Sequence, residues 1–522
     1  MQNSKRIIYF FALLKFLIPF LLIHPTFELH RDEYLYLADS DHLAWGYIEM
    51  PPMLALMGAI SKLLGGSFYT VYFWGGLLGA LTMIVAGKIA VALKGDITAV
   101  YITCIAFLFS GFLRMHILFQ PNMLDVFFWT LSAYYIIKWI DTSNKKYLYF
   151  IGICFGLGIL SKYTIAFFIV AFLAGVLLSK QRTWLLNKHF YFAMLIGIII
   201  PLPNLFWQWQ HHFPVWHHMQ LLKNQQLQYL SRKQFILDQV LFTFSSFYIW
   251  LTGLFALFFS KPGRKYILIG WIYIFVIALL ISQHGKSYYA ASIYPVLLAI
   301  GAVYFERLLF QLSSTILKKS IQIIVSLLII VIGIKILPLA VPYESPEKLE
   351  KLFTKMNVGK LGVLDWEEKK NNPLPQDYAD MLGWKEMAEK TAKVYHQLPD
   401  SVQQKTMVYG NNYGEAAALA FYRKQLGLPE IYSDDASFAF WLPEKFNYQY
   451  FLFATHPMPN ANDTFFYHFK TTEIKDSVTQ KYAREYKAKI VLYSFPDDTA
   501  RNIAERNIKE LKAKYNLHSI LK

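Results

Sequence analysis

Hydrophobic residues form long uninterrupted segments over the first two thirds of the chain. Between residues 7 and 341, apolar runs of about 17–25 residues alternate with polar loops, and runs of this length can cross a hydrocarbon core of about 30 Å. The predicted spans are residues 7–24, 68–93, 96–113, 121–140, 147–161, 162–179, 189–207, 236–259, 266–282, 288–308 and 320–341. The pattern predicts a polytopic α-helical membrane protein with about 11 transmembrane helices.

The pattern changes after residue 342, where short apolar runs alternate with charged and turn-forming residues. Runs rich in β-branched and aromatic residues predict strands at 405–410, 449–455 and 489–495. Apolar residues at helical spacing predict helices at 383–398, 414–427 and 498–515. We therefore expect a transmembrane domain at 1–342 and a soluble α/β domain at 343–522.

Lysine and arginine residues favour one side of the predicted membrane domain. With the N-terminus in the cytoplasm, every short loop on that side carries at least two of them, whereas the opposite loops, notably 25–67 and 208–235, are longer and poorer in them. This positive-inside bias accounts for the net charge of +16 better than nucleic-acid binding does. An odd number of spans places the domain at 343–522 outside the cytoplasm, in a periplasmic compartment.

An acidic stretch, RDEYLYLADSDHLAWGYIEMPPM (31–53), follows the first span on the predicted outer face. Its spacing predicts a helix over 31–44 that lies along the membrane surface. Asp32 and Glu49 bracket the stretch and could meet at one site. Carboxylates in this position can act as a general base, bind a divalent cation through oxygen ligands, or remain solvated.

Two lysines occupy unusual positions for this topology. Lys162 lies in LSKYT (160–164), at an outer turn between two spans, and Lys286 lies in the outer loop HGKSYY. A lysine near the membrane interior costs about 2.5–3.5 kcal/mol on insertion scales, so it tends to mark a buried partner or a ligand pathway. Either lysine alone could extend to the interface instead. Two on the same face as the acidic stretch favour an anionic ligand there.

Arg114 and His116 lie near the outer end of a span, and Asp125 lies just inside the next span. These residues could form a structural pair across the hairpin, or Arg114 could contact a donor substrate. The outer loop also contains two adjacent histidine pairs, His211, His212, His217 and His218. A surface loop that handles the acceptor is a better interpretation of this group than a metal site, because zinc ligands usually come from more than one element.

Several motifs, taken in order, resemble one family. They are the stretch 31–53, LRMHILFQPNMLDVFFW (113–129), GLGILSKYT (156–164), PLPNLFWQWQHHFP (201–214) and GKSYYAASIYP (285–295). Together they resemble the family-39-like glycosyltransferases of the GT-C superfamily, which include the protein O-mannosyltransferases and the bacterial aminoarabinose transferase of lipid A. QDYADMLGWKEMA (376–388) and GNNYGEAAAL (410–419) are similar to the bacterial branch, although the resemblance gives them no role.

The resemblance implies an inverting transferase that uses a polyprenyl-phosphate-linked sugar at the outer face of the cytoplasmic membrane. Asp32 then corresponds to the catalytic base or a metal-side carboxylate, Glu49 to the second acidic position, and Glu33 to a neighbouring candidate. Lys162 and Lys286 correspond to residues that bind the donor phosphate. Where the aminoarabinose transferase has a lysine after the second acid, this chain has Met50, so the sugar and the acceptor (glycan, lipid or protein) stay open.

The remaining ligand predictions complete this picture. Arg114 is a third candidate for the donor phosphate, and Asp32 with Glu49 could share a Mg²⁺ or Mn²⁺ ion. The predicted substrate contacts are Tyr36, Tyr47, Tyr288 and Tyr289. The last two are equally typical of aromatic residues at a membrane interface. The rival interpretations are a transporter or flippase for polyprenyl lipids, against which the absence of an internal repeat argues, and a non-catalytic lipid-binding subunit.

Overall fold

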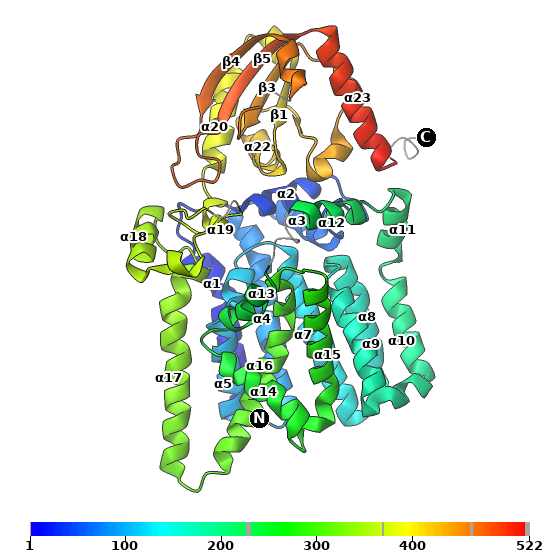
Figure 1. The fold of residues 1–522 in the computed structure, drawn as a ribbon, viewed down its shortest axis with the longest axis vertical. Helices are drawn as coiled ribbons and strands as arrows, with labels where there is room; N and C mark the ends of the chain where they lie inside the picture. Colours follow the sequence, from blue (N-terminus) through cyan, green and yellow to red (C-terminus); the bar gives the residue numbers. More distant parts are fainter. Residues whose placement is uncertain (1, 226–230, 368–369, 460–462, 517–522) are drawn as a thin grey trace.

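The computed structural model describes residues 2–225, 231–367, 370–459 and 463–516. It consists of a long helical bundle, a layer of short helices lying across one end of that bundle, and a domain with a β-sheet above this layer (Figure 1). The predicted outer loop at 208–235 is described except for residues 226–230.

The bundle is built from apolar helices that coincide with most predicted spans. They are α1 (Gln2–Leu22), α4 (Phe68–Ala92), α5 (Ile97–Leu108), α7 (Pro121–Thr142), α8 (Lys146–Ser161), α9 (Ile165–Leu178), α10 (Lys188–Ile199), α14 (Phe247–Phe259), α15 (Ile267–Ser282), α16 (Tyr294–Phe310) and α17 (Thr315–Ala340). By length and composition, the described chain has four helices able to cross a membrane, or up to seven if each bent pair counts as one span. A polytopic membrane protein is therefore supported, whereas the predicted count of about 11 spans is not confirmed.

Three predicted spans are not single straight helices. Residues 96–113 divide into α5 and α6 (Phe112–Met115), and residues 189–207 divide into α10 and α11 (Leu202–Gln210), bent by 47°. The largest departure is 236–259, where α13 (Arg232–Phe242) meets α14 at 105°.

Hydroxyl groups at the break explain the bend between α13 and α14. Ser245 Oγ donates to the carbonyl of Phe109, just past the end of α5, and Trp250 Nε1 donates to Thr243 Oγ1 at 2.8 Å. These contacts satisfy polar groups that a continuous apolar span would leave unpaired. The prediction of one straight span over 236–259 is wrong for this reason.

The layer across the bundle end holds α2 (Arg31–Asp39), α3 (Met53–Leu63) and α12 (Pro214–Gln225) (Figure 1). The predicted helix over 31–44 ends early, at Asp39, and Ser40 Oγ bonds back to the carbonyl of Leu37 at 2.6 Å. The following loop returns on itself, because the Tyr47 hydroxyl bonds to the carbonyls of Asp39 at 3.1 Å and His42 at 3.2 Å. The outer segment is therefore a short helix and a fixed loop.

The C-terminal domain contains a five-stranded mixed sheet in the order β2-β1-β3-β5-β4. Its strands are β1 (Thr406–Gly410), β2 (Ile431–Tyr432), β3 (Tyr450–Thr455), β4 (Phe469–Ser477) and β5 (Lys489–Pro496). β1 pairs in parallel with β2 and β3, whereas β5 is antiparallel to β3 and β4. The predicted strands are β1, β3 and β5. The sequence pattern missed β2, which has two residues, and β4, an edge strand with mostly exposed side chains.

The helices of this domain also follow the predicted pattern. The three long ones are α20 (Trp384–His396), α22 (Tyr413–Leu426) and α23 (Asp498–Lys514). The shorter ones are α18 (Pro346–Met356), α19 (Gln376–Ala379) and α21 (Asp400–Gln403). The 3-10 segments in the described residues are η1 (Lys180–Leu186), η3 (Gly263–Tyr266), η4 (Ser287–Ile293), η5 (Val358–Leu361), η6 (Ala436–Trp441) and η7 (Thr464–His468).

The C-terminal domain packs directly on the outer segment. The hydroxyl groups of Tyr34 on α2 and Tyr422 on α22 lie 3.2 Å apart. The Glu28 carboxylate accepts the backbone N–H groups of Gly383 at 3.1 Å and Lys385 at 2.7 Å, at the start of α20. A carboxylate in this position satisfies free helix donors and complements the helix dipole. These contacts hold the domain over the first acidic turn of α2.

Candidate active site

Asp32 lies in the first turn of α2, where neutral donors from two other parts of the chain reach it. The Tyr413 hydroxyl of α22 donates to Oδ1 at 2.9 Å, and Gln120 Nε2 donates to Oδ2 at 3.2 Å. The side chain of Asp32 remains 29 % exposed, so a ligand can still approach it. Burial and the nearby Asp32 charge raise the pKa of Tyr413 well above its ordinary value, which keeps its proton available for this bond.

A chain of hydrogen bonds links Asp32 to Lys162. Asn122 Nδ2 donates to Gln120 Oε1 at 3.2 Å, while the side-chain oxygen Oδ1 of Asn122 accepts from Lys162 Nζ. Gln120 and Asn122 flank Pro121 at the start of α7. The acid and the lysine that the sequence singled out are thus joined across one short polar bridge.

Lys162 is surrounded by groups that suit a site for an anionic ligand. Its ammonium lies 5.3 Å from the centre of the Tyr288 ring and 4.8 Å from that of Tyr289. It is also within electrostatic range of Asp125 and Lys286. Tyr288 is in turn within electrostatic range of Asp32. Both predicted tyrosines therefore lie beside Lys162, and Tyr288 is also near Asp32.

Lys286 occupies the same side of the site and acts on two neighbours. Burial, and after it the charge of Lys286, lowers the pKa of His218 to about 4, so this histidine is neutral. Burial alone would raise the pKa of Asp377, but Arg114, His30 and, more weakly, Lys286 hold it below its ordinary value. Lys162 and Lys286, the two predicted phosphate-binding lysines, come from different loops and lie within electrostatic range of each other.

Arg114 has a different environment from the one predicted. Its Nε donates to the Asp377 carboxylate at 3.1 Å, and its Nη2 donates to the Asp377 carbonyl at 3.2 Å. The guanidinium also lies 5.0 Å from the centre of the Tyr378 ring. These contacts favour a role in anchoring the segment around α19 over the predicted contact with a donor phosphate.

The predicted structural pair of Arg114 or His116 with Asp125 is wrong. Asp125 accepts hydrogen bonds from Trp129 Nε1 and Ser292 Oγ, each at 2.8 Å. His116 Nδ1 instead contacts the carbonyl of Phe112 at 2.8 Å, one turn back on its own segment. The hairpin is held by packing rather than by a charge pair.

Glu33, the neighbour of Asp32, is fully buried and its two oxygens bind backbone groups. Oε2 accepts from His30 N at 2.6 Å, which completes a capping box at the start of α2, and Oε1 accepts from Phe119 N at 2.5 Å. Burial raises its pKa, and these two bonds oppose the shift. The geometry favours a structural role, because both oxygens already have donors.

Glu49 lies in a second acidic group, with Asp39. Ser437 Oγ, from η6 of the C-terminal domain, donates to Glu49 Oε2 at 2.9 Å, and Ile48 N donates to the same hydroxyl at 3.1 Å. Asp39 is fully buried, its carboxyl oxygens have no donor among the described residues, and it lies within electrostatic range of Glu49. Burial first, and then the mutual interaction, raise the pKa of Asp39 well above its ordinary value.

These two acidic groups do not form a single cation site. Asp32 contacts Tyr413 and Gln120, whereas Glu49 contacts Ser437 and Asp39, and the two carboxylates share no hydrogen-bond partner. Within the described ranges, no group of three or more His, Cys, Asp or Glu side chains is arranged to hold a metal ion. The donor set thus does not fit the predicted sharing of Mg²⁺ or Mn²⁺, nor does the histidine loop supply a set of three ligands.

The other two predicted substrate tyrosines differ in position. Tyr36 is within electrostatic range of both acidic groups: burial raises its pKa, and Asp32, Tyr413 and Glu49 add to the shift. Tyr47 is buried, and its hydroxyl bonds to backbone groups of the preceding segment, at Asp39 and Ala44. Tyr36 is thus placed near a ligand at Asp32, whereas the contacts of Tyr47 favour a structural role.

Four further residues of the site were not predicted from the sequence, and none of them carries a charge. They are Gln120, Asn122, Tyr413 and Ser437. Gln120 and Asn122 stand within the family-like motif at 113–129, and Tyr413 stands within GNNYGEAAAL (410–419). Those motifs were the available signal, although neither indicated a contact with Asp32.

Comparison with known proteins bears on the fold and on residues 49–207. Residues 49–207 match the family model described as dolichyl-phosphate-mannose-protein mannosyltransferase. The fold is similar to that of ArnT from Cupriavidus metallidurans bound to undecaprenyl phosphate, with a TM-score of 0.54 and 13% identity, over 92% of this chain and 96% of that one. The apo structure of ArnT gives 0.53 and 12% over the same shares. No curated protein matches in sequence. Together these findings confirm the predicted resemblance to the GT-C superfamily.

Proposed function

We propose that the chain transfers a sugar from a polyprenyl-phosphate donor to an acceptor, because its fold is similar to that of ArnT and its residues 49–207 match a mannosyltransferase family model. The observation that carries the proposal is the hydrogen-bonded bridge between Asp32 and Lys162 through Gln120 and Asn122. It joins a group that can take a proton to a group that can hold a phosphate.

Asp32 acts as the general base in this proposal. It removes a proton from the acceptor hydroxyl or amine as that atom attacks the anomeric carbon of the sugar. The bond between this carbon and the phosphate oxygen breaks in the same step, so the configuration inverts. Two neutral donors orient the carboxylate and leave it partly exposed, as this role requires.

Lys162 and Lys286 stabilise the leaving phosphate. Negative charge builds up on the bridging oxygen as the sugar departs, and fixed cations near that atom lower the barrier. The two lysines approach each other from different loops, and like charges in a confined site favour binding of an anion. The similar ArnT structure was solved with undecaprenyl phosphate, which supports a lipid phosphate as the leaving group.

The C-terminal domain supplies part of this site in our proposal. Tyr413 orients the base, while Arg31 lies 4.4 Å from the centre of the Tyr413 ring and supports it. The lysine distribution along the chain supports an outer-face location in the cytoplasmic membrane. Because domain contacts cover one side of Asp32, the acceptor reaches the site from the opposite side, near Tyr36 and Tyr288.

The test is a transfer assay with the purified full-length chain in lipid nanodiscs. Undecaprenyl-phosphate-linked sugars of the hexose and pentose classes are incubated with envelope lipids, glycans and proteins as acceptors, and release of undecaprenyl phosphate is measured. We expect release that depends on the acceptor and a product with inverted anomeric configuration. Movement of the intact donor across the bilayer without release would instead identify a flippase.

A further inference from the structure

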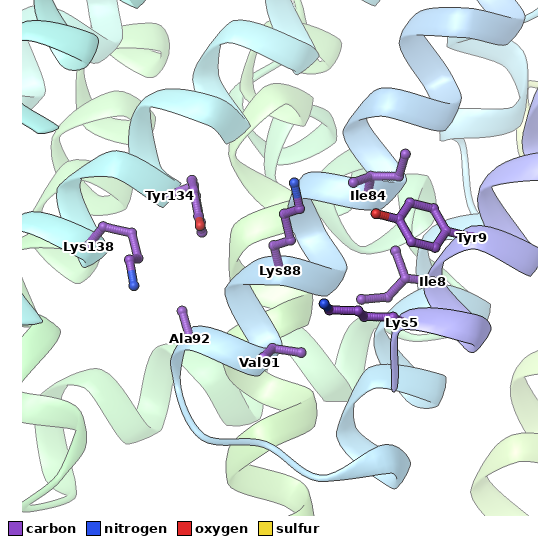
Figure 2. A pocket seen from close by; sticks show the side chains of 9 residues that line it. All are labelled: Lys5, Ile8, Tyr9, Ile84, Lys88, Val91, Ala92, Tyr134 and Lys138. Atoms are coloured by element: carbon purple, nitrogen blue, oxygen red, sulfur yellow. The ribbon is translucent and has the colours of Figure 1, made fainter. Parts of the chain in front are cut away.

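A second concentration of charge lies at the other end of the bundle. Lys5 on α1, Lys88 on α4 and Lys138 on α7 line one cavity of about 200 Å³ (Figure 2). Lys138 follows Gln120 by 18 residues along α7, a rise of about 27 Å at 1.5 Å per residue. The cavity is therefore separate from the candidate active site and lies in the opposite half of the membrane domain, near the N-terminus (Figure 1).

The three ammonium groups form no ion pair with any residue that the structure describes. None of the ion pairs formed within the described part of the chain involves Lys5, Lys88 or Lys138, and no carboxylate lines the cavity. Figure 2 shows Lys88 lying between Lys138 with Tyr134 on one side and Lys5 with Tyr9 on the other. Gathering like charges around one space costs free energy unless an anion enters it.

The rest of the lining is suited to a lipid. The side chains of Ile8, Ile84, Val91 and Ala92 give the cavity an apolar wall, and the rings of Tyr9 and Tyr134 stand at its edge. Tyrosine is enriched where acyl chains meet headgroups. A volume of about 200 Å³ is smaller than a typical small-molecule pocket of about 300–1,000 Å³. It fits a phosphate group with its adjoining glycerol, while the acyl chains remain in the bilayer.

We propose that this cavity binds the phosphate headgroup of an anionic phospholipid in the leaflet farther from the C-terminal domain. A general excess of lysine on one side would satisfy the positive-inside bias at any position. Here, three separate helices each contribute one lysine to the same cavity, which is the arrangement of basic pockets that hold anionic headgroups between transmembrane helices. The bound lipid ties α1, α4 and α7 together and stabilises the bundle.

The test compares two triple variants of the full chain in detergent. The first, Lys5→Gln/Lys88→Gln/Lys138→Gln, removes the charges of the cavity. The matched control, Lys180→Gln/Lys188→Gln/Lys319→Gln, removes the same charge from the same predicted face but outside the cavity. Phosphatidylglycerol and phosphatidylcholine are added separately, and native mass spectrometry measures the bound lipid while a melting curve measures stability.

We expect the wild type and the control to bind phosphatidylglycerol at least about 10-fold more tightly than phosphatidylcholine and to melt higher in its presence, whereas the cavity variant loses this preference. Equal losses in both variants would assign the effect to general surface charge, and no loss in either would also overturn the proposal. Inorganic phosphate tested alone should not stabilise the protein as phosphatidylglycerol does. Equal stabilisation by the two would identify a soluble anion as the ligand and would overturn the proposal. If the triple variant fails to fold, Lys88→Gln alone should weaken binding several-fold.

Discussion

Asp32 and Glu49 come from the same acidic stretch, yet the structure gives them opposite environments. Asp32 accepts hydrogen bonds from a phenol and an amide and stays 29 % exposed. Glu49 accepts a hydrogen bond from Ser437 and lies beside buried Asp39, whose pKa is raised by burial and by Glu49. One carboxylate is oriented and accessible, whereas the other is part of the contact between the outer loop and the C-terminal domain.

The difference shows that the partners of an acid, rather than its position in a motif, decide what it can do. A general base needs an unprotonated oxygen within reach of the acceptor. Two carboxyl groups that share a buried hydrogen bond keep a proton between them and lose that ability. Substitutions of the two acids and of the residues that contact them test this difference.

The largest effect should come from Asp32→Asn. The amide keeps the size of the side chain but cannot take a proton, so we expect kcat to fall about 10²- to 10⁴-fold. Binding of the donor, measured by its protection against thermal unfolding, should stay within a few-fold of the wild type, because Lys162 and Lys286 remain. A variant that keeps more than a tenth of the wild-type rate would contradict the assignment of the base.

The next effect should come from Lys162→Ala. Removing one charged contact to the phosphate should raise the apparent KM for the donor and lower kcat/KM by about 10- to 100-fold. Lys62→Ala is the matched control, because Lys62 lies on the same outer layer but pairs with Asp41 at 2.7 Å. An unchanged donor KM in Lys162→Ala, or an equal loss in the control, would exclude the phosphate role.

A smaller effect is expected for Tyr413→Phe, which removes one hydrogen bond to Asp32. We expect kcat to fall about 10-fold while the donor KM stays constant, because the substitution disturbs only the orientation of the base. Tyr422→Phe is the control: it removes a hydroxyl contact between the same two helices, 3.2 Å from Tyr34, but none to Asp32. Similar rates in the two variants would mean that Tyr413 only holds the domain in place.

The smallest effect concerns stability and pH. The pKa of Asp39 is raised in the folded protein, and a carboxyl group in the unfolded chain ionises near pH 4. The folded state therefore keeps a proton that the unfolded state releases, so its stability falls as the pH rises from that point toward the raised pKa. Asp39→Asn removes this penalty.

The melting temperature of Asp39→Asn should exceed that of the wild type at pH 8 by more than it does at pH 5. Transfer activity should change little, because Asp39 does not contact Asp32. A difference in melting temperature that is independent of pH would contradict the protonated state assigned to Asp39.

Much of the architecture could be predicted from the sequence, because long apolar runs and alternating strands leave strong periodic signals. The spans at 68–93 and 121–140 and the strands at 405–410 and 489–495 coincide with α4, α7, β1 and β5. The bend within 236–259 was missed, because one of the hydroxyl groups at the break bonds to Phe109, 136 residues away along the chain. Hydrophobic pattern alone does not report such contacts.

The predicted part of the site consists of charged residues and of tyrosines from the same motifs. Asp32 and Lys162 were identified because charged residues are unusual next to apolar spans. Gln120 lies 88 residues from Asp32 along the chain, and Tyr413 lies 381 residues away. Neutral side chains brought together over such separations leave no local pattern, so the folded structure is needed to find them.

The most direct test measures Asp32→Asn and Glu49→Gln side by side, in the same nanodiscs, with the same undecaprenyl-phosphate-linked sugar. Both variants replace a carboxylate by its amide and so differ only in which acid is removed. We predict that Glu49→Gln keeps at least about a tenth of the wild-type kcat, whereas Asp32→Asn falls at least about 100-fold. Equal losses, or a larger loss in Glu49→Gln, would contradict the account.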